Sequence, residues 1–133
     1  ASHVGSALEE LASVVEHFEQ DYRTCVEQVL DAGFSPVVCT IYNGDFSGEA
    51  FPYESVSQEV VDAALNMWDG AILQSALDYR LPVVDLRRVC SSPGDFTQVI
   101  EPNEQGGRKI AEALHRAIAD PEASSVRIGP AGT

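Results

Sequence analysis

Apolar side chains recur every three or four positions over the first part of the chain. This repeat is typical of one face of a long amphipathic helix, and it runs through Leu8, Leu11, Val15, Phe18, Tyr22, Val26 and Val29. Ser6 and Glu9 have the spacing of a capping box. We therefore expect a helix that begins near Ser6 and ends near Asp31, before Gly33.

Two short runs further along the chain are apolar and rich in β-branched residues. They cover Pro36–Tyr42 and Leu81–Leu86, and each predicts a strand that is buried on both faces, as in a parallel sheet. Between them a capping box at Ser55–Gln58 opens a second helix, whose apolar side carries Val56, Val60, Ala64, Leu65, Trp68, Ile72 and Ala76. The strand–helix–strand order predicts a crossover with two parallel strands.

The remaining chain reads as a loop, a helix and a tail. The loop runs from Arg87 to Pro102, the helix from about Asn103 to Ala119, and the residues after Pro121 are small and polar. We therefore assign residues 1–120 to a portion of one α/β domain and residues 121–133 to a flexible tail.

Two parallel strands are too few to form a stable sheet, because both would be edge strands with unpaired backbone groups. We expect the missing pairing to come from strands that precede residue 1 in a longer protein, or from a partner chain. The pattern thus predicts the C-terminal portion of a doubly wound, parallel α/β domain. Self-association through the strand edges is a weaker alternative, in which two copies form a homo-oligomer.

Composition narrows the classes of function. The formal net charge of −13 over 133 residues argues against binding to nucleic acid and to anionic membrane surfaces, which require clustered Lys and Arg. No apolar run is long enough to span a bilayer, and no signal peptide is visible at the start of the sequence. The widely separated Cys25, Cys39 and Cys90 form no Cys-x-x-Cys pair, so we expect buried, reduced thiols, no metal site and no cofactor, and we favour a cytoplasmic location.

Candidate chemistry is concentrated just before the last helix. Pro102 restrains the approach to that helix and biases Glu101 toward an extended conformation, while Asn103 has the character of an N-cap. Glu101 would act as a catalytic or substrate-contacting carboxylate, or would stabilise the first turn of the helix. Asp95 lies in the same loop and would either orient a base or form a turn.

A polar loop follows the first predicted strand, between Asn43 and Tyr53. Ligands of open α/β sheets bind at the carboxyl ends of strands, so Asn43 and Asp45 are candidates to border a substrate cleft. The spacing of Asn43, Asp45, Ser47 and Gly48 with Glu54 also fits a calcium loop, although Pro52 interrupts it. A polar loop without a metal is the simpler interpretation.

Several of these segments together resemble a known enzyme family. They are similar in order and spacing to the C-terminal half of bacterial SGNH (GDSL-type) hydrolases, and the likeness covers roughly residues 7–119. The segments that carry it are Tyr22–Arg23, Val38–Asn43, Leu81–Arg87, Asp95–Phe96, Ile100–Asn103 and Gly106–Ala111. The resemblance implies a flavodoxin-like, three-layer αβα fold, of which only the C-terminal strands are present in this chain. It also implies cleavage of a carboxylic ester by acyl transfer, with a nucleophilic serine in a Gly-Asp-Ser motif and an Asp-x-x-His motif near the C-terminus.

The chain departs from that pattern at two points. It contains neither Gly-Asp-Ser nor Gly-x-Asn-Asp, and Gln98 and Glu101 stand at the positions of the family's Asp and His. The resemblance therefore implies part of an esterase whose nucleophile lies outside this chain, with Glu101 as the base, supported by Asp95. A carboxylate can take this role when burial raises its pKa. The alternative is a subunit or interaction module of similar fold that has lost the chemistry.

Overall fold

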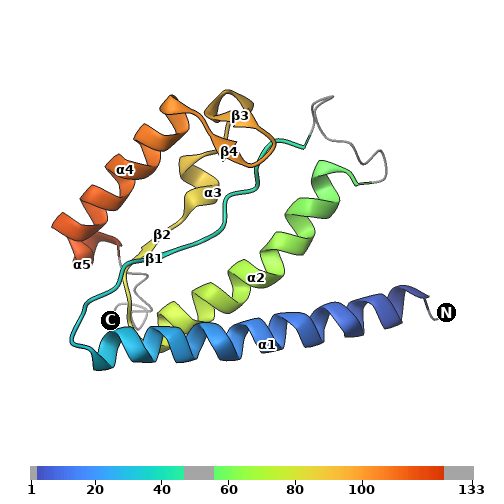
Figure 1. Cartoon of the computed structure of the whole chain (residues 1–133), viewed down its shortest axis with the longest axis horizontal. Helices are drawn as coiled ribbons and strands as arrows, with labels where there is room; N and C mark the ends of the chain where they lie inside the picture. The colour runs from blue at the N-terminus through green and yellow to red at the C-terminus, as the bar shows by residue number, and fades with distance from the viewer. Residues whose placement is uncertain (1–2, 47–55, 125–133) are drawn as a thin grey trace, which may run out of the picture.

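Three long helices and two pairs of very short strands make up the structure, a computed structural model that describes residues 3–46 and 56–124 (Figure 1). The long helices are α1 (His3–Asp31), α2 (Gln58–Asp78) and α4 (Glu104–Ala119). The shorter elements are α3 (Leu86–Val89), the 3₁₀ helix η1 (Pro93–Asp95), α5 (Pro121–Ser124), and the strands β1 (Val38–Cys39), β2 (Val83–Val84), β3 (Phe96–Gln98) and β4 (Glu101–Pro102).

Helix α1 forms where the apolar repeat predicts it. It begins at His3, so Ser6 lies inside the helix and does not cap it. It ends as expected, because Gly33 adopts a φ of +84° and the Gly33 and Phe34 amides donate to the Leu30 and Val29 carbonyls. The second half of the helix buries Val26 in a cluster with α2 and β1.

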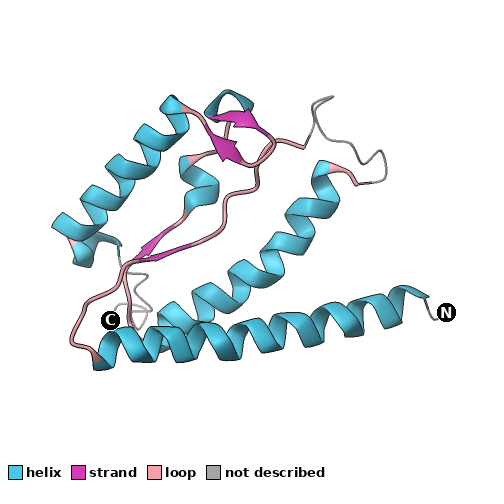
Figure 2. Ribbon diagram, viewed as in Figure 1, coloured by secondary structure: helices cyan, strands magenta, loops and turns pink. Residues whose placement is uncertain are grey.

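Strands β1 and β2 lie side by side in parallel, with Val38 opposite Val83 and Cys39 opposite Val84. Helices cover both faces of this pair (Figure 2). Val38 packs into the cluster formed with α1 and α2, and Val84 packs into a second cluster with α3 and α4. The alternation follows from the period of two along a strand.

The predicted flavodoxin-like three-layer sheet is wrong for this structure. Helices account for 68% and strands for 9% of the described residues, and the strands form two separate two-stranded sheets (Figure 2). The apolar runs led to this error because burial between helices selects the same residues as burial inside a sheet. Each run contributes only two residues to the ladder. Beyond β1, the Ile41 amide donates to the side chain of Asp69 at 2.7 Å instead of to another strand.

The segment predicted as one long loop is more ordered than expected. Asp85 caps α3 by accepting from the Arg87 amide, and β3 pairs with β4 as a small antiparallel hairpin. Asn103 caps α4, as predicted, because its Oδ1 accepts from the Gly106 amide at 3.0 Å. The start of the tail, Pro121–Ser124, is helical.

The second helix also differs at its start. Its N-cap is Ser57, whose side chain accepts from the Val60 amide, whereas the predicted cap Ser55 lies outside the described residues. The three cysteines are free, and Cys90 is buried, but Cys25 is exposed, contrary to expectation. Among the described residues, no helix combines the length and the hydropathy needed to cross a membrane.

Candidate functional site

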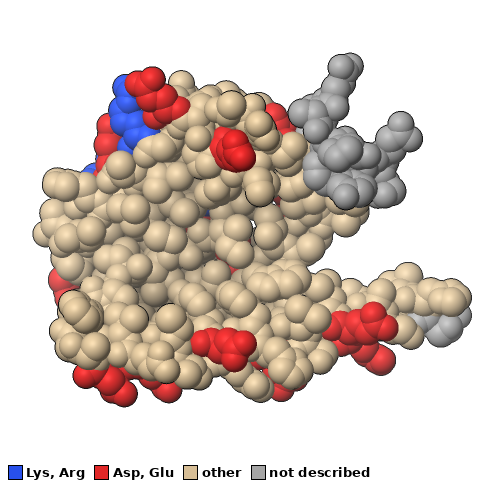
Figure 3. All heavy atoms as spheres, in the orientation of Figure 1, with Lys and Arg blue, Asp and Glu red and all other residues tan. Residues whose placement is uncertain are grey.

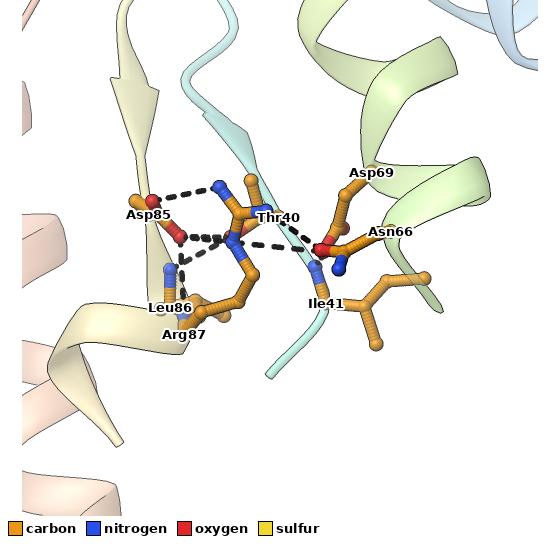
Figure 4. Close-up of polar contacts among 7 residues, drawn as sticks. All are labelled: Thr40, Ile41, Asn66, Asp69, Asp85, Leu86 and Arg87. Carbon is orange, nitrogen blue, oxygen red and sulfur yellow. Dashed lines mark hydrogen bonds and ion pairs between the residues drawn. The ribbon is translucent and has the colours of Figure 1, made fainter. Parts of the chain in front are cut away.

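The carboxyl ends of β1 and β2 are joined by a polar network (Figure 4). Thr40 Oγ1 donates to Asp85 Oδ1 and accepts from the Leu86 amide, both at 2.9 Å. Thr40 is buried, so this hydroxyl fixes the end of β1 against the start of α3. The network forms here because both strands end at polar side chains that satisfy the next backbone groups.

Arg87 extends this network toward α2. Its guanidinium binds both oxygens of Asp85, at 2.7 Å from Nε and 2.9 Å from Nη2, and its Nη1 donates to Asn66 Oδ1 at 3.2 Å (Figure 4). The bidentate pair lowers the pKa of Asp85 and raises that of Arg87. Arg87 is therefore held rigidly at the edge of the strand pair.

Asp69 is the most deeply buried charged group of this network, with a side chain that is 0% exposed. Its Oδ1 accepts from the Ile41 amide, but its Oδ2 has no hydrogen bond among the described residues and lies 3.7 Å from Arg87 Nε. Burial raises the pKa of Asp69, while the Ile41 amide and Arg87 act in the opposite direction. A buried carboxylate with a raised pKa and a nearby charged partner is often found close to a functional site.

A pocket of about 400 Å³ opens beside this network. Its polar lining includes the side chains of Asn43, Asp45, Gln58, Asp62, Arg87 and Ser92. Asn43 carries a buried Oδ1 that has no hydrogen-bond donor among the described residues, and unsatisfied acceptors of this kind call for a functional explanation. The structure thus places both candidate substrate contacts, Asn43 and Asp45, at one pocket.

The loop that carries these two residues is attached to the β3–β4 hairpin. Tyr42 Oη donates to the Ile100 carbonyl at 2.9 Å, and the Asp45 amide donates to the Val99 carbonyl at 2.7 Å. Gly44, with a φ of +74°, allows this contact, because a Cβ at this position would lie 2.5 Å from the Val99 oxygen. The pocket wall is therefore joined directly to the residues that precede Glu101.

Asp95 holds the other side of the same hairpin. Its carboxylate is buried and accepts from Lys109 Nζ at 2.7 Å, Gln105 Nε2 at 3.1 Å and the Ser92 amide at 3.2 Å. The Lys109 ammonium is the main cause that lowers the pKa of Asp95. With both oxygens occupied, Asp95 pairs with Lys109 and not with Glu101, so it positions the hairpin without orienting a base.

Glu101 lies on β4, opposite Gln98 of β3, and both side chains are exposed. Glu101 is therefore not buried in the described part of the chain, in contrast to the expectation for a carboxylate base. The structure brings Asn43 and Asp45 together at the pocket, and attaches their loop to the hairpin of Glu101. It does not bring Asp95 and Glu101 together, because the carboxylate of Asp95 is buried and the side chain of Glu101 is exposed.

Sequence reasoning missed the network of Thr40, Asp69, Asp85 and Arg87. Asp85 carried a usable signal, because it is a charged residue inside the run Leu81–Leu86, which was predicted as a buried strand. Asp69 carried another, because it stands three residues before Ile72, among the apolar positions of a predicted helix. Of the proposed calcium loop, Ser47, Gly48 and Glu54 lie outside the described residues. In the described ranges, no three His, Cys, Asp or Glu side chains are grouped so as to hold a metal ion.

Comparison with known proteins identifies no relative: no family model, no curated protein and no solved structure matches this chain.

Proposed function

We propose that this chain supplies the binding pocket and the general base of a hydrolase that cleaves carboxylic esters, similar to the bacterial SGNH enzymes. The nucleophilic serine would lie on sequence outside these 133 residues. One observation carries the proposal: the loop with Asn43 and Asp45 is hydrogen-bonded to the carbonyls of Val99 and Ile100, the two residues that precede Glu101. The candidate binding residues and the candidate base thus belong to one connected unit.

In the proposed reaction, the serine hydroxyl attacks the ester carbonyl and transfers its proton to the Glu101 carboxylate. The tetrahedral intermediate collapses to an acyl-enzyme, and the alcohol leaves with that proton. Water then attacks the acyl-enzyme by the same proton path, releasing the acid and restoring the serine. The segment that brings the serine would also have to cover Glu101, because desolvation makes a carboxylate a stronger base.

The same proposal includes a partner for the strand pair. Val38 and Thr40 direct their amides to β2, at 2.9 Å from the Pro82 carbonyl and 3.1 Å from the Val84 carbonyl. In a parallel ladder the amide of the intervening Cys39 therefore points to the opposite edge of β1. We propose that an N-terminal segment of the same protein, or a partner chain, adds a strand along this edge.

The test uses a longer polypeptide that includes the sequence encoded upstream of Ala1, with p-nitrophenyl acetate as substrate. Glu101→Gln should lower kcat by about 10²- to 10⁴-fold, as expected for loss of a general base. Glu112→Gln is the matched control, because Glu112 is exposed in the middle of α4, and it should leave kcat unchanged. The 133-residue chain alone should not turn over the ester. Full activity of Glu101→Gln, or turnover by the chain alone, would contradict the proposal.

A second candidate function is a binding subunit without catalysis. It is favoured by the exposed Glu101 and Gln98, which stand where the SGNH enzymes that the sequence resembles carry a His and an Asp. In this case a fluorophosphonate probe should label no serine of the longer polypeptide. Labelling of one serine, together with a loss of turnover in Glu101→Gln, would reject this candidate.

A further inference from the structure

Helix α2 directs a line of polar side chains toward the segments that follow β1 and β2. Spacings of four, four and three place these residues on one face of the helix: Gln58, Asp62, Asn66 and Asp69. Arg87 lies against the last two of them, since its Nη1 donates to Asn66 Oδ1 at 3.2 Å and its Nε lies 3.7 Å from Asp69 Oδ2 (Figures 3 and 4). A cation with N–H donors is thus already part of this wall.

The first two residues of the same line face the pocket of about 400 Å³. Asp62 Oδ1 accepts from Gln58 Nε2 at 2.7 Å, and Gln58 Oε1 accepts from the Phe46 amide at 2.7 Å. Both side chains are therefore held in place at the pocket wall. No Lys or Arg in the described part of the chain pairs with Asp62. Asp62 thus brings to the pocket a negative charge that no base among these residues balances.

The other polar groups of the lining favour a ligand that donates hydrogen bonds. Arg87 is the one Lys or Arg among the described residues of the lining. Its Nε and Nη2 bind Asp85 and its Nη1 binds Asn66, so its donors are already used. Asn43, in contrast, has a buried Oδ1 with no donor among the described residues. Rotation about the soft terminal torsion of this side chain can turn the acceptor toward the pocket, which Asn43 lines.

The size of the pocket and its apolar part limit the rest of the ligand. A volume of about 400 Å³ is far larger than a bare metal ion and is typical of sites for small organic molecules. Phe96 lines the pocket and is half-buried, with its ring centroid 5.6 Å from that of Tyr42. An aromatic ring packs against an apolar body and also attracts a cation.

We propose that this pocket binds a small organic cation with N–H donors, such as a primary ammonium on an apolar body. The cationic group pairs with Asp62, as Arg87 pairs with Asp69 two turns further along α2. It donates to Asn43 Oδ1, and the apolar body lies against Phe96. Under the ester chemistry proposed above, on which the assignment of a substrate rests, the substrate is an ester whose acid or alcohol part carries this cation.

The test titrates the isotope-labelled 133-residue chain with three probes of similar shape and follows the backbone amides by NMR. Benzylamine is a cation with N–H donors, benzyltrimethylammonium is a cation without them, and benzyl alcohol is a neutral donor. Benzylamine should bind at least about tenfold more tightly than the other two, which is the effect of one hydrogen bond between charged groups. It should shift the amides of Gly44, Asp45 and residues 58–62.

This titration measures binding and not turnover, so it separates the cation site from the ester chemistry. A chain that prefers benzylamine, in a longer polypeptide that cleaves no ester, would reject the proposed hydrolase alone. An active esterase whose pocket does not prefer benzylamine would reject the cation site alone.

Asp62→Asn removes the charge and keeps the shape of the side chain, so it should weaken the binding of benzylamine at least about tenfold. Glu59→Gln is the matched control, because Glu59 is exposed on the same helix and does not line the pocket. It should change the affinity less than about twofold, since solvent and salt screen an exposed charge. Absence of binding, equal binding of benzylamine and either other probe, unchanged affinity of Asp62→Asn, or equal losses in both variants would overturn the proposal.

Discussion

At the scale of single residues, Asp69 makes two opposed contributions to stability. Its Oδ1 accepts the Ile41 amide, which no strand pairs, while its charge is buried without a full complement of hydrogen bonds. Asp69→Ala leaves the Ile41 amide without its acceptor, and should lower the free energy of unfolding by about 2 kcal/mol. Urea unfolding at pH 7 measures this loss.

Asp69→Asn should have the opposite effect at pH 7, because asparagine retains an acceptor for Ile41 and removes the buried charge. Burial raises the pKa of Asp69 in the folded state, so the wild-type protein loses stability as the pH rises from the unfolded value of about 4 through the folded value. The advantage of Asp69→Asn should therefore be present at pH 7 and vanish below about pH 4. A variant less stable than wild type at pH 7 would mean that attraction to Arg87 outweighs the cost of burial.

The candidate site was only partly predictable at this scale. Asn43 and Asp45 were found because polar residues after a buried strand have a known place in α/β proteins. The role of Asp95 was not, because its partner Lys109 is 14 residues away in sequence and contacts it only after α4 folds back. The exposure of Glu101 was equally invisible, since it depends on the register of the β3–β4 hairpin.

At the scale of elements, two adjacent glycines of α4 have different roles. A Cβ at Gly106 would lie close against the Asp95 carbonyl oxygen and within 3.2 Å of Pro102, whereas a Cβ at Gly107 meets nothing within 4 Å. Gly106→Ala should therefore push α4 away from η1 and destabilise the protein by about 2 kcal/mol. Gly107→Ala should stabilise it by up to about 1 kcal/mol, since alanine favours the helix.

Thermal unfolding of the two variants compares them directly, and each controls for the other because both add one methyl group to the same helical turn. Equal effects of the two substitutions would show that the close contact between α4 and Asp95 does not limit packing. A loss of stability confined to Gly106→Ala would confirm that this contact holds the hairpin that carries Glu101.

The long helices were predictable from the sequence, whereas the extent of the sheet was not. A helix satisfies its backbone hydrogen bonds within its own segment, so the apolar repeat and the Asn103 cap locate α1 and α4 to within a few residues. A strand depends on partners from elsewhere in the chain. The runs Pro36–Tyr42 and Leu81–Leu86 have the composition of longer strands, yet each pairs over two residues. Beyond the ladder, the Ile41 and Leu86 amides donate to the side chains of Asp69 and Thr40, and α3 begins at Leu86.

At the scale of the whole molecule, stability is distributed unevenly. One cluster joins α1, α2 and β1, and a second joins β2, α3 and α4, so the two short strands connect the two cores. Neither core contains a residue from the first half of α1, in which Leu11 and Val15 are half-buried. Helical segments that lack packing open locally without global unfolding.

Amide hydrogen exchange should reveal this difference within a single helix. Amides of residues 7–13 should exchange at least about tenfold faster than those of residues 22–29, because the latter are held by the core around Val26. Residues 110–117 of α4, around the buried Ala113 and Ala117, provide an internal reference. Uniform protection along α1 would show that the projecting half is stabilised to the same extent as the half that packs against the core.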